Sequence, residues 1–134
     1  MNLTEHYVLD TAALLAMGGN KQVSGLIHAA AASDDVRLWV PVLCLLEAER
    51  ERGGTVAHVG VLLEVLRVID DDYALALTVA ELCRESAPGG VDFGVAAAVH
   101  AARPNLMLPD GALVATVAPE PYARLGVGVM DLNR

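Results

Sequence analysis

The stretch YVLDTAALLAM, residues 7–17, decides how the chain is expected to fold. Its first three residues are bulky and largely apolar, and Asp10 ends this run before a segment rich in Ala and Leu begins. The pattern predicts a short buried strand that ends at Asp10 and a helix that follows directly. An acid at the carboxyl end of such a strand lies where open α/β sheets build their ligand sites, but it is equally suited to cap the helix that starts at Thr11. This stretch alone leaves both roles open.

Outward from this stretch, the same order of strand and helix recurs to the end of the chain. Further strands are predicted at 37–40, 65–69, 112–116 and 127–131, and helices at 23–31, 41–52, 56–63, 73–83 and 92–103, with a short helical turn at 120–125. Alternation with short connections predicts a parallel sheet with helices on both faces. The length of 134 residues matches one domain. We therefore expect a single α/β domain, residues 1–134, built as a three-layer α/β/α sandwich around a mostly parallel sheet of four to five strands.

The charge of the chain argues against broad electrostatic capture of nucleic acid. The formal net charge is -8, whereas a surface that binds phosphates needs a basic excess. A local basic rim remains open, because eight of the nine cationic residues are Arg, whose side chain can hold phosphate oxygens in a bidentate fork.

The cysteines and the N-terminus exclude several other classes of protein. Cys44 and Cys83 stand singly in apolar segments, without the paired spacing of a zinc site or the density of a disulfide scaffold. Residues 1–17 contain Glu5 and Asp10 and no basic stretch, so we predict neither a signal peptide nor a membrane span. The expected location is the cytoplasm.

Two further acids stand beside apolar segments that the fold would bring to the same rim as Asp10. Glu47 lies on the face of its helix that also carries Leu43 and Cys44, and its alternative role is an exposed pair with Arg50. Asp92 opens an almost wholly apolar helix, and its alternative role is the N-cap of that helix. A cap and a metal ligand are compatible roles for one carboxylate.

Three carboxylates in one site require a compensating cation, because like charges at close range raise each other's pKa. Ligation by oxygen alone favours Mg²⁺ or Mn²⁺ over zinc. Such an ion can generate a hydroxide nucleophile and stabilise the negative charge that develops on a phosphodiester. Metal-assisted hydrolysis is therefore the chemistry that these acids would support.

The order of these motifs resembles the PIN domain family, and in particular its branch of VapC-type ribonuclease toxins. The resemblance covers nearly the whole chain and rests on four segments: VLDTAALL (8–15), VPVLCLLE (40–47), VDFGVAAAVHAAR (91–103) and LVATVAPEPYARLG (113–126). It implies a Mg²⁺- or Mn²⁺-dependent ribonuclease in which Asp10, Glu47 and Asp92 are the metal-binding and catalytic residues. It also implies that Thr11 or Thr116 orients a ligand or water.

The same resemblance implies partners for the chain. Members of this family usually form homodimers and are restrained by an antitoxin, whose amphipathic helix would lie in an apolar groove here. RNA is the implied substrate, and no membrane association is implied.

The sequence departs from the family pattern at one acidic position. The family commonly carries an acid two residues after the threonine of the closing strand, and this chain has Ala118 there. Asp110 or Glu120 could replace that acid only if its loop bends back toward the pocket. The departure leaves a second hypothesis, a catalytically degenerate PIN-like domain that acts as a protein-binding or regulatory module. A third is an interaction domain of another α/β type in which the acids only cap helices.

Overall fold

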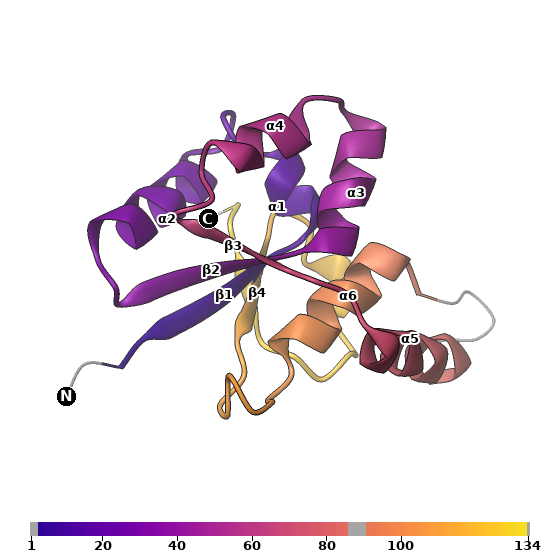
Figure 1. Cartoon of the computed structure of the whole chain (residues 1–134). Coiled ribbons are helices and arrows are strands. Elements are labelled where there is room, and N and C mark those ends of the chain that lie inside the picture. Colours follow the sequence, from indigo (N-terminus) through magenta and orange to yellow (C-terminus); the bar gives the residue numbers. More distant parts are fainter. Residues whose placement is uncertain (1–2, 86–90, 134) are drawn as a thin grey trace.

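The computed structural model describes residues 3–85 and 91–133 and forms an α/β structure with five strands and six helices (Figure 1). The strands are β1 (Glu5–Leu9), β2 (Val36–Pro41), β3 (Leu66–Ile69), β4 (Leu113–Thr116) and β5 (Val129–Asp131). The helices are α1 (Thr11–Leu15), α2 (Lys21–Ala32), α3 (Val42–Glu51), α4 (Thr55–Gly60), α5 (Tyr73–Glu85) and α6 (Phe93–Ala102), and a 3₁₀ turn, η1, spans Glu120–Tyr122. The predicted alternation of strand and helix is confirmed.

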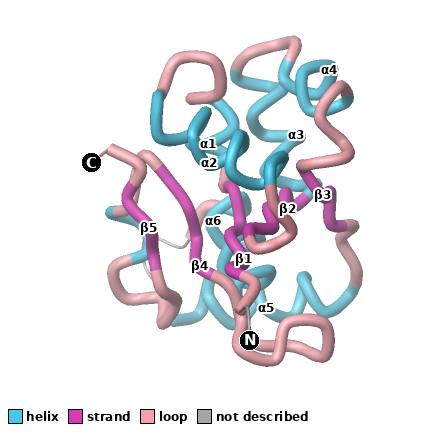
Figure 2. Tube along the Cα trace, turned by 90° about the vertical axis from the view of Figure 1, so that its left-hand side faces the viewer, coloured by secondary structure: helices cyan, strands magenta, loops and turns pink. Residues whose placement is uncertain are grey.

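The five strands form one sheet in the order β3-β2-β1-β4-β5, and each pair of neighbours is parallel. Strand β1 lies at the centre, where Val8 is opposite Trp39 of β2 on one side and Val114 of β4 on the other. The predicted α/β class with a parallel sheet of four to five strands is thus confirmed, and the sheet has five (Figure 2).

The helices cover the two faces of the sheet, as Figure 1 shows: α1 to α4 lie on one face, and α5 and α6 lie on the other. The handedness of parallel connections explains this division, since a crossover between parallel strands is almost always right-handed. The chain steps from β1 to β2 to β3 in one direction, so the connecting helices lie on the same face. It then returns past β1 to β4, and the helices of that connection lie on the opposite face.

The core is made of aliphatic residues of the sheet and an alanine-rich helix. Val8, Leu38 and Val114 are fully buried in the three central strands. Helix α6 buries seven of its residues, mostly Ala, which agrees with its predicted position in the core. Small side chains allow α6 to pack closely against both the sheet and α3.

Two element boundaries differ from the predicted ones in an informative way. Strand β1 ends at Leu9, and Asp10 is the N-cap of α1, so the predicted cap is present and the acid lies directly after the carboxyl end of the strand. The helix predicted at 56–63 ends earlier, since α4 stops at Gly60 and a turn leads into β3. Within the described residues, none of the helices has the length and hydropathy needed to cross a membrane.

Candidate metal centre

The carboxyl ends of β1, β2 and β4 form a cleft of about 310 Å³ where α1, α3 and α6 meet. In a sheet with this order the chain leaves β1 toward β2, and β4 lies on its other side, so a crevice opens at the ends of these strands. The cleft is lined by Asp10, Thr11, Ala12, Leu15, Glu47, Glu51, Asp92, Gly94, Val95, Ala118, Pro121 and Tyr122. The three acids predicted from the sequence therefore line one cleft.

Asp10 is buried and held from two sides. Its Oδ1 accepts a hydrogen bond from the backbone N–H of Ala13 at 2.9 Å, which caps α1, and its Oδ2 accepts one from the hydroxyl of Tyr122 at 2.7 Å. Burial raises the pKa of Asp10, and hydrogen bonds from Thr116, Ala13 and Tyr122 oppose that rise. The structure thus keeps an ionisable group in a place that disfavours its charge and supplies donors that partly offset the cost.

Glu47 and Asp92 meet at a single backbone donor. The N–H of Gly94, in the first turn of α6, donates to Glu47 Oε1 at 3.0 Å and to Asp92 Oδ1 at 2.9 Å. The pKa of Glu47 is raised by burial first, then by the negative charge of Asp92 and by a hydrogen bond with it. These two carboxylates form a close pair of like charges, which is the electrostatic condition that a divalent cation relieves.

Gly94 is required for this close approach. A β-carbon at position 94 would collide with Oε2 of Glu47 and would lie 2.7 Å from Oγ1 of Thr11. The same Thr11 hydroxyl donates to Glu47 Oε2 at 3.3 Å. Two positions were considered for Glu47, one in the cleft and one in an exposed pair with Arg50. Its hydrogen bonds with Thr11 and Gly94 place Glu47 in the cleft, and no ion pair with Arg50 occurs among the described residues.

Asp92 is exposed at the rim of the cleft and caps α6 through Gly94, so the predicted cap is present in the structure. Thr116 is fully buried at the end of β4, where its Oγ1 accepts a hydrogen bond from the N–H of Ala118 at 3.0 Å and its side chain also hydrogen-bonds to Asp10. Thr11 and Thr116 thus contact two of the three acids directly.

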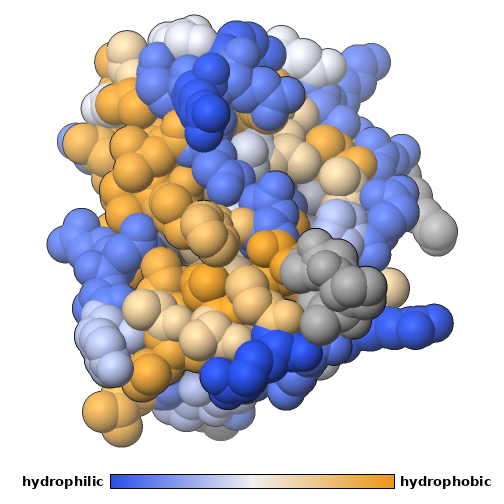
Figure 3. All heavy atoms as spheres, turned by 90° about the vertical axis from the view of Figure 1, so that its right-hand side faces the viewer, coloured by the Kyte–Doolittle hydropathy of each residue, from blue (hydrophilic) through white to orange (hydrophobic). Residues whose placement is uncertain are grey.

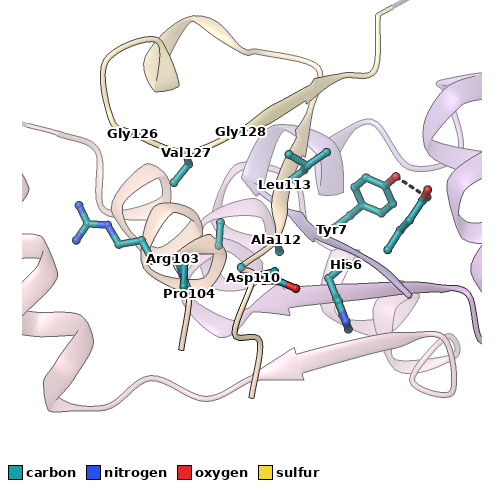
Figure 4. A pocket seen from close by; sticks show the side chains of 13 residues that line it. His6, Tyr7, Arg103, Pro104, Asp110, Ala112, Leu113, Gly126, Val127 and Gly128 are labelled. Carbon is teal, nitrogen blue, oxygen red and sulfur yellow. Dashed lines mark hydrogen bonds between the residues drawn. The ribbon is translucent and has the colours of Figure 1, made fainter. Parts of the chain in front are cut away.

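Neither of the acids considered as a replacement at position 118 reaches the cleft. Glu120 is exposed on η1 and is absent from the lining, while the methyl group of Ala118 is part of it. Asp110 lies at the opposite end of the sheet, in a hollow of about 480 Å³ beside His6, Arg103 and Leu113 (Figure 4). In that hollow the hydroxyl of Tyr7 donates to Glu5 at 2.8 Å. The hollow surrounds the amino ends of β1, β4 and β5, away from the strand ends where α/β sheets bind ligands.

The residues of the cleft suit a hard divalent cation in their chemistry. All the charged side chains that line it are carboxylates, and Mg²⁺ is usually bound through one or two carboxylates while it keeps several waters. The Glu47–Asp92 pair meets this requirement. Among the described residues, however, no three His, Cys, Asp or Glu side chains are arranged to hold one ion together. The structure thus brings Glu47 and Asp92 together at one donor and places Asp10 in the same cleft.

Two residues of this cleft were not predicted from the sequence. Tyr122 supplies the second anchor of Asp10 from 112 positions away, and Glu51 is exposed but lines the cleft one turn after Glu47. The helical spacing of Glu47 and Glu51 could have indicated that they share a face. No local pattern could have indicated Tyr122. His100 of α6 is not part of the cleft, and its Nδ1 lies 2.8 Å from Oγ1 of Thr78 in α5.

Comparison with known proteins finds likeness in structure only. No protein-family model matches the sequence, and no curated protein is similar to it. A chain of the crystal structure of VapBC2 from Rickettsia felis, bound to a DNA fragment from its promoter, has a TM-score of 0.69 and 13% identity over 94% of this chain and 98% of its own. A chain of VapBC-1 from nontypeable Haemophilus influenzae has a TM-score of 0.67 and 15% identity over 96% of this chain and 99% of its own. At these identities the likeness shows the fold.

Proposed function

We propose that this chain, which has the PIN-domain fold of the VapC-type proteins, is a metal-dependent ribonuclease that hydrolyses phosphodiester bonds of RNA in the cytoplasm. The observation that carries the proposal is the Glu47–Asp92 pair, which shares the N–H of Gly94 beside the buried Asp10. A close pair of carboxylates in a cleft at the strand ends, with the pKa of Glu47 raised, is typical of sites that use ionisable groups for chemistry.

In this proposal, Asp10, Glu47 and Asp92 hold Mg²⁺ or Mn²⁺. The bound ion would supply an activated water and stabilise the charge that develops on the phosphate. Glu47 would be one of the carboxylate ligands of the ion, and two donors hold its side chain in position. Thr11 fixes the direction of its Oε2, and Gly94 fixes its Oε1. Thr116 and Tyr122 orient Asp10.

The negatively charged RNA would also have to approach a cleft that is lined with acids. No Lys or Arg occurs among the described residues that line the cleft, and the chain has a net charge of -8. A phosphate group would therefore be repelled from the metal-free cleft, since like charges in a narrow site interact strongly. Binding of RNA should consequently depend on the metal and weaken when the metal is removed.

We further propose an antitoxin and a second copy of the chain as protein partners. Hydrophobic residues gather on the face of the molecule that Figure 3 shows. Phe93 and Leu46, which neighbour the site residues in sequence, are more than half exposed. A mainly apolar hollow of about 550 Å³ includes Trp39, Ile69 and Met107. Exposed apolar surface of this kind marks protein interaction sites. Light scattering of the purified chain would measure its oligomeric state.

The test is cleavage of a mixed-sequence single-stranded RNA with Mn²⁺ or Mg²⁺, with and without EDTA. Wild type, Asp10→Asn and Glu47→Gln would be compared with Glu120→Gln, which alters an exposed acid outside the cleft. The proposal requires metal-dependent cleavage that both site variants lose and that Glu120→Gln retains. Cleavage that persists in Asp10→Asn and Glu47→Gln would contradict it.

A partner-binding module without catalysis is the second candidate. Ala118 favours it, because the cleft has one acid fewer than the family pattern, and so does the absence of a basic residue in the described lining. This candidate predicts a folded protein that neither cleaves RNA nor binds Mn²⁺. Tight Mn²⁺ binding that is lost in Glu47→Gln would contradict it.

A further inference from the structure

We propose that Tyr122 is a positioning residue of the metal centre, whose hydroxyl holds the Asp10 carboxylate in place for the cation in a site that has Ala118 where a further acid is expected. The inference rests on the proposed function, since it assumes that the cleft binds a divalent metal. Tyr122 was not among the site residues predicted from the sequence, and it lies shortly after Ala118 in the same loop.

The geometry around Asp10 leaves its side chain little freedom. One carboxylate oxygen accepts the N–H of Ala13 at 2.9 Å, and the other accepts the Tyr122 hydroxyl at 2.7 Å. The first donor belongs to the helix that Asp10 itself caps, and the second comes from the far end of the chain. Hydrogen bonds to both oxygens restrict both side-chain torsions of Asp10, and the Thr116 side chain adds a third hydrogen bond to the same carboxylate.

The segment that carries Tyr122, the 3₁₀ turn η1, has restricted backbone freedom. Tyr122 is 2% exposed and ends η1, in which Pro121 restricts the backbone and the N–H of Tyr122 donates to the carbonyl of Pro119 at 3.1 Å. The turn also packs against α6, the helix that begins at Asp92. Two elements of the site therefore hold the Tyr122 side chain in place: β4, which directly precedes the turn in the chain, and α6, which packs against the turn.

A hydrogen bond from Tyr122 does not prevent Asp10 from binding a cation. An ionised carboxylate has about four lone-pair directions, of which Ala13, Tyr122 and Thr116 use one each. The remaining direction is open to a metal ion or to a water bound to it. Donors that contact a metal ligand from behind commonly set its orientation, and their loss typically weakens metal binding by about 10- to 100-fold.

The proposal also accounts for the composition of the closing loop. An acid at position 118 would add a ligand and a further negative charge to a cleft that already holds Asp10, Glu47 and Asp92. With Ala118 the chain has fewer ligands, so the orientation of those that remain matters more for affinity. Tyr122 provides a neutral donor in the same loop, which orders Asp10 and adds no charge.

The experiment measures the Kd for Mn²⁺ by titration calorimetry on the full chain without RNA. We expect Tyr122→Phe to weaken Mn²⁺ binding by about 10- to 100-fold, because the ring is retained and only the hydroxyl is lost. The matched control is Tyr7→Phe, which removes another buried tyrosine hydroxyl that donates to a carboxylate, Glu5, at the opposite end of the sheet. Tyr7→Phe should leave the Kd unchanged.

A double-mutant cycle separates positioning from a general loss of structure. If Tyr122 acts through Asp10, then Tyr122→Phe should have no further effect on the Kd in a chain that already carries Asp10→Asn. An equal loss in both backgrounds would overturn the inference, and so would an unchanged Kd in Tyr122→Phe while wild type binds Mn²⁺. In both cases the proposed ribonuclease would still stand. A wild-type chain that is folded but binds no Mn²⁺ would overturn the inference together with the proposed function.

Discussion

Asp10 combines a structural role with a place in the proposed metal centre. As the N-cap of α1 it satisfies a backbone donor that the helix cannot satisfy itself, and as a buried acid beside Tyr122 it keeps a carboxylate in the cleft. These two roles make different demands on the side chain. Capping needs only an oxygen at the right place, while binding of a cation needs a negative charge.

Substitutions of Asp10 should therefore separate the two roles. Asp10→Asn keeps a capping oxygen, so we expect the free energy of unfolding to change little while metal binding is weakened. Asp10→Ala should lower the free energy of unfolding by about 2 to 3 kcal/mol, because this substitution removes the cap and leaves the buried Tyr122 hydroxyl without its partner. Urea unfolding without metal measures both.

Asn20→Ala provides the comparison, since Asn20 caps α2 through Val23 but contacts no acid of the cleft. Its expected cost is about 1 kcal/mol. If Asp10→Ala cost no more than Asn20→Ala, the Tyr122 hydrogen bond would contribute nothing to stability.

Glu47 predicts a pH dependence of stability in the metal-free protein. Its pKa in the folded chain is raised by burial and by Asp92, so the folded state binds a proton more tightly than the unfolded state. The corresponding stability is fully present below the ordinary carboxyl pKa and is lost as the pH rises through the raised value. Glu47→Gln should remove this loss and stabilise the metal-free chain at pH 7 by a few tenths to about 1 kcal/mol.

The difference between wild type and Glu47→Gln, measured by urea unfolding from pH 4 upward, isolates this effect from other carboxyl groups. Such a control is necessary because Glu49, whose pKa is lowered by the backbone N–H groups of Val56 and Gly54, contributes stability that is lost as the pH falls. A Glu47→Gln chain that is less stable than wild type at pH 7 would contradict the prediction.

At the scale of elements, the site depends on how closely the first turn of α6 approaches α3. Gly94 permits this approach, because a β-carbon there would occupy the space of Glu47 Oε2 and Thr11 Oγ1. Gly94→Ala should therefore push the two helices apart, destabilise the fold by about 1 to 3 kcal/mol and weaken Mn²⁺ binding. Thermal unfolding and Mn²⁺ titration provide the measurements.

Gly25→Ala is the matched control for this substitution. Gly25 lies within α2, and a β-carbon at its position would meet nothing within 4 Å. Since Ala is the better helix former, Gly25→Ala should stabilise the chain by about 0.5 to 1 kcal/mol. The same substitution should thus have opposite signs at two helical positions, and equal signs would show that the space at Gly94 is not limiting.

The elements themselves could be predicted from the sequence because they follow local periodicity. The apolar runs at residues 7–9 and 112–116 and the Ala-rich segment before Arg103 each indicate one element, and their alternation indicates a parallel sheet. The shared N–H of Gly94 and the Tyr122 hydrogen bond could not be predicted in this way. Both depend on which side chains meet after the strands and helices have packed, and periodicity carries no information on such contacts.

At the scale of the whole molecule, metal binding should be linked to folding. A cation that binds the assembled cleft but not the unfolded chain stabilises the folded state by about 2.7 kcal/mol at a concentration one hundred times its Kd. We therefore expect Mn²⁺ to raise the melting temperature of wild type and EDTA to reverse the rise. Glu47→Gln should show little of this increase.

Glu120→Gln is the control for the metal effect, because it removes one negative charge from an exposed position outside the cleft. Its melting temperature should respond to Mn²⁺ as that of wild type does. An equal response in Glu47→Gln would mean that the ion acts on the overall charge of -8 and not on the cleft.

The central place of β1 in the sheet has a consequence for the synthesis of this protein. The partner of β1 on one side, β2, is synthesised soon after it. The partner on its other side, β4, and the hydrogen-bond donor of Asp10, Tyr122, are synthesised much later. A nascent chain can therefore assemble the half of the sheet that contains β1, β2 and β3 before its last segment leaves the ribosome. Until then one edge of β1 is unpaired and open to wrong partners. The cleft is incomplete for the same period, so a ribosome that is still translating this chain does not carry a finished cleft.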